Sequence, residues 1–218
     1  MKTKLLLALL GAIMLNGCSL KEEPKEQVWK IQNDPYYKHK KSQFEVLALN
    51  EKYKTIMLGD SITDEGQWDE LLNNDTIQNR GISGDTTDGV LDRVDSINKN
   101  IEKVFIMIGV NDIMRGKSVD EIYANYLKII QVFEEKNIKI YIQSTLYIGE
   151  TRKSNFNSKV EELNKKLEKY ASENKITFIN LNPIFAPNKI LKKEFTFDDL
   201  HLNGKAYSLW ATEIKKYF

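Results

Sequence analysis

Short runs of apolar residues alternate along the chain with longer stretches in which apolar residues recur every three or four positions. Two of the short runs, FIMI at 105–108 and IYIQ at 140–143, are apolar enough to be buried on both faces, as strands of a parallel sheet are. In all, five runs predict β-strands: Thr55–Leu58, Thr76–Asn79, Val104–Ile108, Lys139–Gln143 and Thr177–Asn180.

The longer stretches predict amphipathic helices over Val119–Lys136, Asn155–Asn174 and Gly204–Phe218. Each places its apolar residues along one stripe, and the second carries Lys and Glu on its other face. Residues 34–50 predict a packed helical lead-in before the first strand. The apolar residues on which that last prediction rests are Tyr36, Tyr37, Phe44, Leu47 and Leu49.

Alternation of strands and helices predicts an α/β fold, because parallel strands need crossover connections and a sheet buries both faces under helices. We expect a three-layer α/β/α sandwich with a five-stranded parallel, doubly wound, flavodoxin-like sheet. No repeat, linker or low-complexity stretch divides residues 31–218, which predicts one domain. In such sheets ligands bind beyond the carboxyl ends of the strands, so chemistry is expected there.

Composition narrows the class of protein. The chain has 218 residues, of which 41% are hydrophobic and 29% charged, with a net charge of +1. These values exclude a disordered chain, and the near-neutral charge argues against a nucleic-acid partner. Cys18 is the single cysteine, so neither an intramolecular disulfide nor a zinc–thiolate cluster can form. A mechanism that needs a histidine base must choose between His39 and His201.

The amino-terminal residues have the pattern of a targeting segment. Lys2 and Lys4 precede an apolar run from Leu5 to Leu15, which as a helix would rise about 16 Å and is too short to span a bilayer. The residues that follow, Leu-Asn-Gly-Cys, end at Cys18 and resemble a bacterial lipobox. This resemblance implies a signal peptide at 1–17, acylation of Cys18 and a polar tether at 18–30. The alternative is an ordinary secretory signal with an incidental cysteine.

Processing of this kind would remove two lysines and no acids, which leaves a charge of 30 − 31 = −1. A basic surface would then not hold the protein to anionic lipid, and the membrane contact would be the lipid anchor on Cys18. Leu20 stands where an aspartate retains some bacterial lipoproteins at the inner membrane. We therefore expect a cell-envelope location, at the outer membrane or the surface.

Four polar clusters carry candidate chemistry, and three of them follow a predicted strand. They are Gly59-Asp60-Ser61, the stretch from Asn79 to Thr87 that contains Gly81 and Gly84, Gly109-Val110-Asn111-Asp112, and Asp198-Asp199-Leu200-His201. A serine at a strand-to-helix turn can act as a nucleophile beside backbone N–H groups. A carboxylate three residues before a histidine can orient its ring across one tight turn.

Each cluster also has a purely structural interpretation. Ser61 can cap a helix, the glycines can serve in turns, and Asn111 can form an Asx turn. The G-x-S-x-G elbow of α/β-hydrolases is absent, because Thr63 stands where its second glycine would be.

Taken together and in this order, the clusters resemble the SGNH hydrolases, also called the GDSL esterase/lipase family. The match spans residues 54–205 and departs from the GDSL pattern at Ile62, where leucine is usual. The stretch NRGISGDTTDGVLDR is similar to the branch related to platelet-activating-factor acetylhydrolase. The resemblance implies Ser61 as nucleophile, His201 as base and Asp198 as its partner. It also implies an oxyanion hole of Ser61, Gly81 and Asn111, without a metal or organic cofactor.

This resemblance implies a serine esterase for short-chain O-esters, acetyl foremost, with sialic acid or another glycan as the expected alcohol. A lysophospholipase or thioesterase for longer acyl chains is the first alternative. A non-catalytic surface lipoprotein that binds glycan or host protein is the second. Acetyl transfer is a third, although many SGNH transferases rely on a membrane-embedded acyl supplier and no spanning helix is evident.

Overall fold

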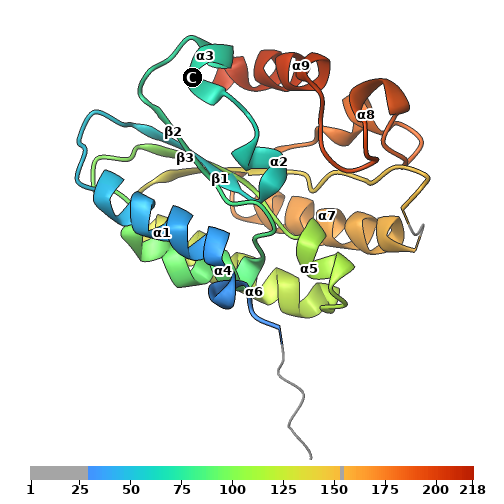
Figure 1. Ribbon diagram of the computed structural model, residues 1–218, viewed down its shortest axis with the longest axis horizontal. Coiled ribbons are helices and arrows are strands. Elements are labelled where there is room, and N and C mark those ends of the chain that lie inside the picture. Colours follow the sequence, from blue (N-terminus) through green and yellow to red (C-terminus); the bar gives the residue numbers. More distant parts are fainter. Residues whose placement is uncertain (1–28, 153–154) are drawn as a thin grey trace, which may run out of the picture.

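The computed structural model describes residues 29–152 and 155–218. The predicted signal peptide, Cys18 and the tether up to residue 28 lie outside these ranges. The boundaries 1–17, 18–30 and 31–218 therefore remain predictions. Figure 1 shows the described part as a central sheet with helices on both sides.

The sheet has five parallel strands in the order β2-β1-β3-β4-β5. This is the predicted doubly wound, flavodoxin-like arrangement, and each predicted strand is present with its ends shifted by at most two residues. The strands are β1 (Thr55–Gly59), β2 (Ile77–Gly81), β3 (Lys103–Met107), β4 (Lys139–Gln143) and β5 (Thr177–Ile179). Because β1 lies between β2 and β3, the chain leaves the sheet centre in both directions and opens a crevice at the carboxyl ends of these strands.

Alternate side chains of each strand enter two separate cores. Ile56 and Leu58 of β1 belong to the core under α4 (Thr87–Arg93), α6 (Val119–Glu135) and α7 (Phe156–Glu173). Met57 belongs to the opposite core, under α3 (Trp68–Leu72), α8 (Asn182–Phe185) and α9 (Gly204–Ile214). Figure 1 shows the first group of helices below the sheet and the second above it. The predicted three-layer α/β/α sandwich is confirmed.

The three predicted amphipathic helices are α6, α7 and α9. Ser118 and Glu121 form a capping box at the start of α6, which satisfies N–H groups that have no partner within the helix. Asn203 caps α9 by accepting a hydrogen bond from the Ala206 N–H at 3.2 Å. The short 3₁₀ helix Lys215–Tyr217 follows α9 and completes the predicted segment.

The predicted lead-in is α1 (Pro35–Leu47), with Asp34 as its N-cap. Only Tyr37 and Phe44 of its apolar residues are buried, and they pack with Ile31 and Ile82. The Tyr37 hydroxyl donates to the Gly89 carbonyl at 2.7 Å, which ties α1 to α4. Leu49 is 83% exposed, so the expectation that the whole lead-in is packed was wrong. Only the stripe of α1 that contains Tyr37 and Phe44 faces the rest of the protein, and the other apolar residues of this segment lie outside that stripe.

Shorter helices complete the chain. They are α2 (Ser61–Asp64), α5 (Val110–Met114) and the 3₁₀ turns Ile31–Asn33, Val94–Ser96 and Lys193–Phe195. Within the described ranges, no helix combines the length and the apolar character that a bilayer crossing requires.

Candidate active site

Ser61 lies at the turn between β1 and α2, as the strand-end argument predicts. It is the first residue of α2, and the preceding Asp60 caps that helix by accepting a hydrogen bond from the Ile62 N–H at 3.0 Å. The turn needs a glycine before it, because a Cβ on Gly59 would lie 2.3 Å from the Met107 carbonyl oxygen. Asp60, rather than Ser61, therefore serves as the helix cap, which leaves the Ser61 hydroxyl available.

His201 approaches Ser61 from the loop before α9. Its Nε2 lies 2.9 Å from the Ser61 Oγ, although 140 residues separate the two in the chain. Its Nδ1 lies 2.7 Å from the Asp198 Oδ2. The structure thus brings together the three residues expected to form a triad, in the order hydroxyl, imidazole and carboxylate.

A tight turn holds the Asp198 carboxylate against the imidazole. The other carboxylate oxygen, Oδ1, accepts hydrogen bonds from the Leu200 N–H at 3.0 Å and the His201 N–H at 2.8 Å. Asp199, at the middle of the turn, has a φ of 65°, in the left-handed region that Asp tolerates better than most residues. The Asp199 carboxylate accepts hydrogen bonds from the Thr151 N–H and hydroxyl, so it points away from His201.

Asp198 is held in its charged form. Burial alone would raise the pKa of Asp198, but hydrogen bonds from the His201 N–H and ring and from the Leu200 N–H lower it to about 2. Arg152 adds a cation on the solvent side, with Nη2 3.0 Å from the Asp198 Oδ2 and Nε donating to the Asp198 carbonyl. A carboxylate that stays ionised can stabilise an imidazolium on His201.

Gly81 does not offer a free N–H to this site. Its N–H donates to the Asn79 Oδ1 at 2.8 Å, and the Asn79 amide in turn donates to carbonyl oxygens of α2 and the residues after it. A Cβ on Gly81 would lie 2.1 Å from the Asp64 backbone nitrogen. This glycine lets β2 and α2 approach each other closely, and its N–H is already engaged. The structure therefore argues against the expected oxyanion role of Gly81.

Gly84, in the same stretch, has the properties that Gly81 lacks. Its φ is 77°, and a Cβ there would meet no atom closer than 3.6 Å, so one side of this glycine is open. Within the described residues, no acceptor takes up the Gly84 N–H, nor that of Ser61. Sequence reasoning treated Gly84 as a turn residue. Nothing in the sequence distinguishes it from Gly81, because its free N–H and the neighbouring contact between Asp85 and Asn111 exist only in the folded chain.

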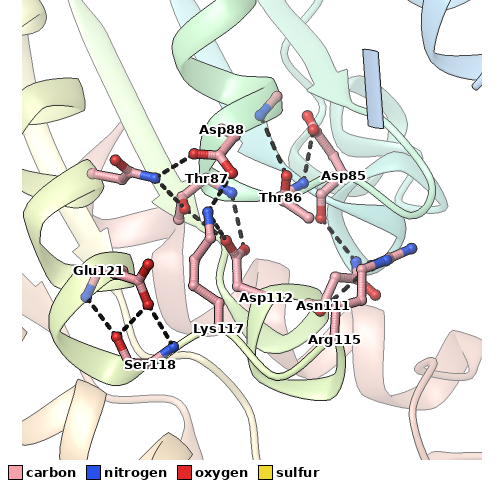
Figure 2. Close-up of polar contacts among 12 residues, drawn as sticks. Asp85, Thr86, Thr87, Asp88, Asn111, Asp112, Arg115, Lys117, Ser118 and Glu121 are labelled. Atoms are coloured by element: carbon pink, nitrogen blue, oxygen red, sulfur yellow. Dashed lines mark hydrogen bonds and ion pairs between the residues drawn. The ribbon is translucent and has the colours of Figure 1, made fainter. Parts of the chain in front are cut away.

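Asn111 follows β3 and lies beside the Gly84–Asp85 turn. Its side chain is buried, and its Nδ2 donates one hydrogen bond to the Asp85 carbonyl at 3.0 Å. An amide nitrogen carries two hydrogens, so a second donor remains. The bond to Asp85 fixes the plane of the amide. Figure 2 shows this contact with the Arg115 side chain next to it.

Buried carboxylates tie the loops of this site together. Asp112 accepts hydrogen bonds from the Thr87 N–H at 2.9 Å and the Thr87 hydroxyl at 2.7 Å, as Figure 2 shows. Asp85 pairs with the Arg93 guanidinium at 2.8 Å, and Arg93 also donates to the Gly59 carbonyl. The loops after β1, β2 and β3 are thus linked below the donors of Ser61, Gly84 and Asn111.

The pKa values of the buried acids Asp60 and Asp85 are raised, whereas the pKa of Asp198 is lowered. Burial raises the pKa of Asp60 to about 7, and the nearby charges of Asp85 and Asp112 act in the same direction. Burial likewise raises the pKa of Asp85 to about 6, although its attraction to Arg93 opposes this. The buried acids serve as anchors for loops, and Asp198 is the carboxylate that contacts the imidazole.

A hydroxyl, an imidazole and a carboxylate in hydrogen-bond contact, beside free N–H donors at the carboxyl edge of a parallel sheet, can attack an ester carbonyl. Fold and site together define an ester-hydrolysing enzyme of the three-layer α/β/α type. The chain belongs to the GDSL-like lipase/acylhydrolase family, whose model matches residues 57–209. The predicted family is confirmed.

Individual relatives refine this assignment. A protein of Streptococcus pneumoniae whose name refers to platelet activating factor has the same fold, with a TM-score of 0.77 and 27% identity over 84% of this chain and 92% of that one. A GDSL-like lipase of Bacteroides thetaiotaomicron has a TM-score of 0.72 and 25% identity over 83% of this chain and 96% of its own.

A third similarity is to the N-acylneuraminate cytidylyltransferase of Streptococcus agalactiae. The two sequences are 27% identical over 192 residues, which is 84% of this chain. The chain spans only 44% of the length of that relative. The activity in the relative's name is therefore not transferred to this chain.

Proposed function

We propose that the protein is a serine esterase that removes short acyl groups, acetyl foremost, from O-esters of glycans by means of Ser61, His201 and Asp198. The observation that carries the proposal is the hydrogen-bonded chain from the Ser61 Oγ through the His201 ring to Asp198. Its distances of 2.9 Å and 2.7 Å allow proton transfer without a rearrangement.

In the first half of the reaction, the Ser61 Oγ attacks the ester carbonyl carbon while the His201 Nε2 takes the hydroxyl proton. The carbonyl oxygen becomes an oxyanion, and we place it among the N–H groups of Ser61 and Gly84 and the Asn111 Nδ2, with Gly84 in the role first assigned to Gly81. When the C–O bond to the alcohol breaks, the alkoxide takes the proton from His201. This leaves an acyl group on Ser61.

In the second half, water attacks the acyl carbon and gives a proton to the His201 Nε2. The tetrahedral intermediate then collapses, the bond to the Ser61 Oγ breaks, and Ser61 recovers its proton from His201. Asp198 keeps the Nδ1–H tautomer in place throughout and stabilises the imidazolium that forms twice per cycle.

A substitution at Ser61 tests the catalytic core of this proposal. Ser61→Ala should lower turnover of p-nitrophenyl acetate by a factor on the order of 10⁶, by analogy with serine proteases, and should abolish labelling by a fluorophosphonate. His39→Ala is the matched control and should stay near wild-type activity, because His39 is exposed on α1. Retained turnover in the alanine variant would remove Ser61 as nucleophile. Absence of labelling in the wild type would instead favour a non-catalytic binding protein.

The glycan part of the proposal rests on the relative that is named for N-acylneuraminate, a sialic acid. The alcohol is accordingly proposed to be a sialic acid or a related sugar that carries O-acetyl groups. Release of acetate from O-acetylated N-acetylneuraminate should exceed release from an acetylated neutral sugar. Equal rates for the two would remove the preference for sialic acid.

A longer acyl chain is the second candidate, since Phe197, next to Asp198, is 94% exposed beside the site. An apolar side chain in that position can contact an acyl chain. The p-nitrophenyl esters of acetate, butyrate and decanoate distinguish the two candidates. A steep fall in kcat/KM with chain length supports acetyl, whereas a rise supports a lysophospholipase or thioesterase.

We further propose that Cys18 carries a lipid anchor, which would hold the enzyme at the cell envelope. The basis is the sequence pattern at residues 2–18. Cys18→Ser should move the protein from the membrane fraction to the soluble fraction and stop incorporation of labelled fatty acid. Membrane association that persists in this variant would contradict the anchor.

A further inference from the structure

A cavity of about 1190 Å³ lies next to the proposed oxyanion donors. It does not include Ser61 or His201. Its wall comes from the start of the described chain, from α4, from α5 with the turn that follows it, and from the first turn of α6. The wall includes Trp29, Ile31, Asp88, Arg115, Lys117 and Glu121.

Gly84 connects this cavity to the proposed active site. Its open side faces the Arg115 Nη2, 3.6 Å from the position a Cβ would take, and the Ile31 Cδ1 at 3.9 Å, and both side chains line the cavity. Two other wall residues, Thr86 and Asp112, directly follow Asp85 and Asn111. The cavity wall and the proposed oxyanion donors are thus formed by neighbouring residues of the same two loops.

The acidic side chains of the wall have partners within the protein. Asp88 pairs with Lys117, and Figure 2 shows these two side chains together. Asp88 also accepts a hydrogen bond from Asn125 at 2.7 Å. Asp112 accepts a hydrogen bond from Thr87 and pairs with Lys117. Glu121 accepts a hydrogen bond from the Ser118 N–H in the capping box. Asp92, the remaining acid, contacts Lys41 and Tyr37.

Arg115 differs from these groups. Within residues 29–152 and 155–218, no carboxylate lies within 4 Å of its guanidinium or of the Lys30 ammonium. The Arg115 Nη1 makes a long contact of 3.4 Å to the Asn111 carbonyl, and its guanidinium carbon lies 4.1 Å from the centroid of the Trp29 ring. The side chain folds back along α5 toward Gly84, so a cation with no direct ion-pair partner among the described residues lies in the cavity wall beside Gly84.

We propose that the cavity binds the alcohol portion of the substrate and that Arg115 binds a carboxylate on it, which makes an acidic sugar the preferred alcohol. This inference rests on the proposed esterase function and deepens it. A guanidinium binds a carboxylate through two parallel N–H···O bonds, a geometry that a lysine cannot reproduce. The Trp29 ring, which is 51% exposed, and the polar groups of the wall suit a hydroxylated ring.

The test compares acetate release from two substrates that differ at one group, the carboxylate: O-acetylated N-acetylneuraminate and its uncharged methyl ester. The wild-type enzyme should prefer the free acid by about 10-fold to 100-fold in kcat/KM, since charge-assisted bidentate bonds are lost with the ester. Arg115→Met should reduce this ratio to about 2 or less, and Arg115→Lys should give an intermediate ratio. Lys169→Met removes an exposed cation from α7 and is the matched control, with the wild-type ratio.

A binding measurement supplies a second readout. Free N-acetylneuraminate should inhibit hydrolysis of p-nitrophenyl acetate competitively, and its inhibition constant should rise at least 10-fold in Arg115→Met but not in Lys169→Met. A wild-type enzyme that hydrolyses both sugar substrates equally, or an Arg115→Met variant that still discriminates, overturns the role of Arg115 and leaves the esterase proposal intact. If p-nitrophenyl acetate is hydrolysed and neither sugar substrate is, both this inference and the proposed glycan substrate are wrong.

Discussion

The carboxyl groups around the Ser61 turn are of two kinds, which differ in exposure, partners and pKa. Asp198 is partly exposed, faces an imidazole and a guanidinium, and has a pKa lowered to about 2. Asp60 and Asp85 are fully buried, and their pKa values are raised to about 7 and about 6. The carboxyl group is thus kept charged at Asp198 and shifted toward its protonated form at Asp60 and Asp85.

The difference shows what each environment is suited to do. A carboxylate that stabilises a forming imidazolium has to be ionised at the pH of the reaction. Several N–H donors and limited burial keep it ionised. A carboxylate that only fixes loops can be buried, because it needs hydrogen bonds more than it needs charge. Asn111 depends on the buried kind, because the Asp85 carbonyl fixes its amide and leaves its second donor free.

Among the substitutions that test this comparison, the largest effect should follow from removing the charge of Asp198. In Asp198→Asn the new amide can donate a hydrogen bond to the His201 Nδ1, so the ring proton moves to Nε2. A protonated Nε2 cannot accept the Ser61 hydroxyl proton. We expect kcat to fall by about 10⁴. Asp199→Asn is the matched control, since its side chain contacts Thr151 and Asn tolerates the left-handed backbone. If the two variants lose activity to the same degree in p-nitrophenyl acetate assays, Asp198 is not the partner of the base.

A smaller effect is expected at Asn111. Asn111→Ala removes a donor whose bond strengthens as the oxyanion forms, so kcat should fall by about 10² to 10³ while KM changes little. The variant leaves the Asp112–Thr87 contacts in place, and a thermal unfolding midpoint near that of the wild type would show this. A loss confined to KM would assign Asn111 to ground-state binding.

The smallest effect concerns stability and the buried acids. Since the folded state raises the pKa of Asp60 from about 3.8 to about 7, folded protein binds the proton more tightly than unfolded protein. Between about pH 4 and pH 7 the free energy of unfolding should therefore fall as pH rises. Asp60→Asn keeps an oxygen that accepts the Ile62 N–H and removes the titration. In urea unfolding, the free energy of unfolding should fall less between pH 5 and pH 8 in this variant than in the wild type, by about 1–3 kcal/mol. Equal losses would mean that Asp60 does not titrate in this window.

Much of the fold could be predicted from the sequence because local patterns encode it. The five strands alternate side chains between two cores, and the resulting apolar runs could be recognised without knowledge of the partners. The exposed Leu49 shows the limit of this approach, since an apolar residue alone does not indicate whether a second surface covers it. The direction in which α1 faces depends on contacts such as the one from Tyr37 to Gly89, which only the folded chain contains.

The site could be predicted in part. Ser61, Asn111 and His201 each had a strand end or a helix cap as a local marker, and the D-x-x-H spacing anticipated the turn at Asp198. Gly81 and Gly84 could not be distinguished, because both are glycines in one loop and only their hydrogen bonds differ. Arg152 and Arg115 carried no signal, since their partners Asp198 and Trp29 are far away in the sequence.

The separation of 140 residues between Ser61 and His201 has a consequence for how the enzyme acquires activity. Every strand of the sheet can form while the imidazole is still distant, because the histidine lies in the loop that leads into the last long helix. Turnover should therefore be the last native property to return during refolding, after the spectroscopic signal of the sheet. The reaction itself thus reports whether the final segment has docked.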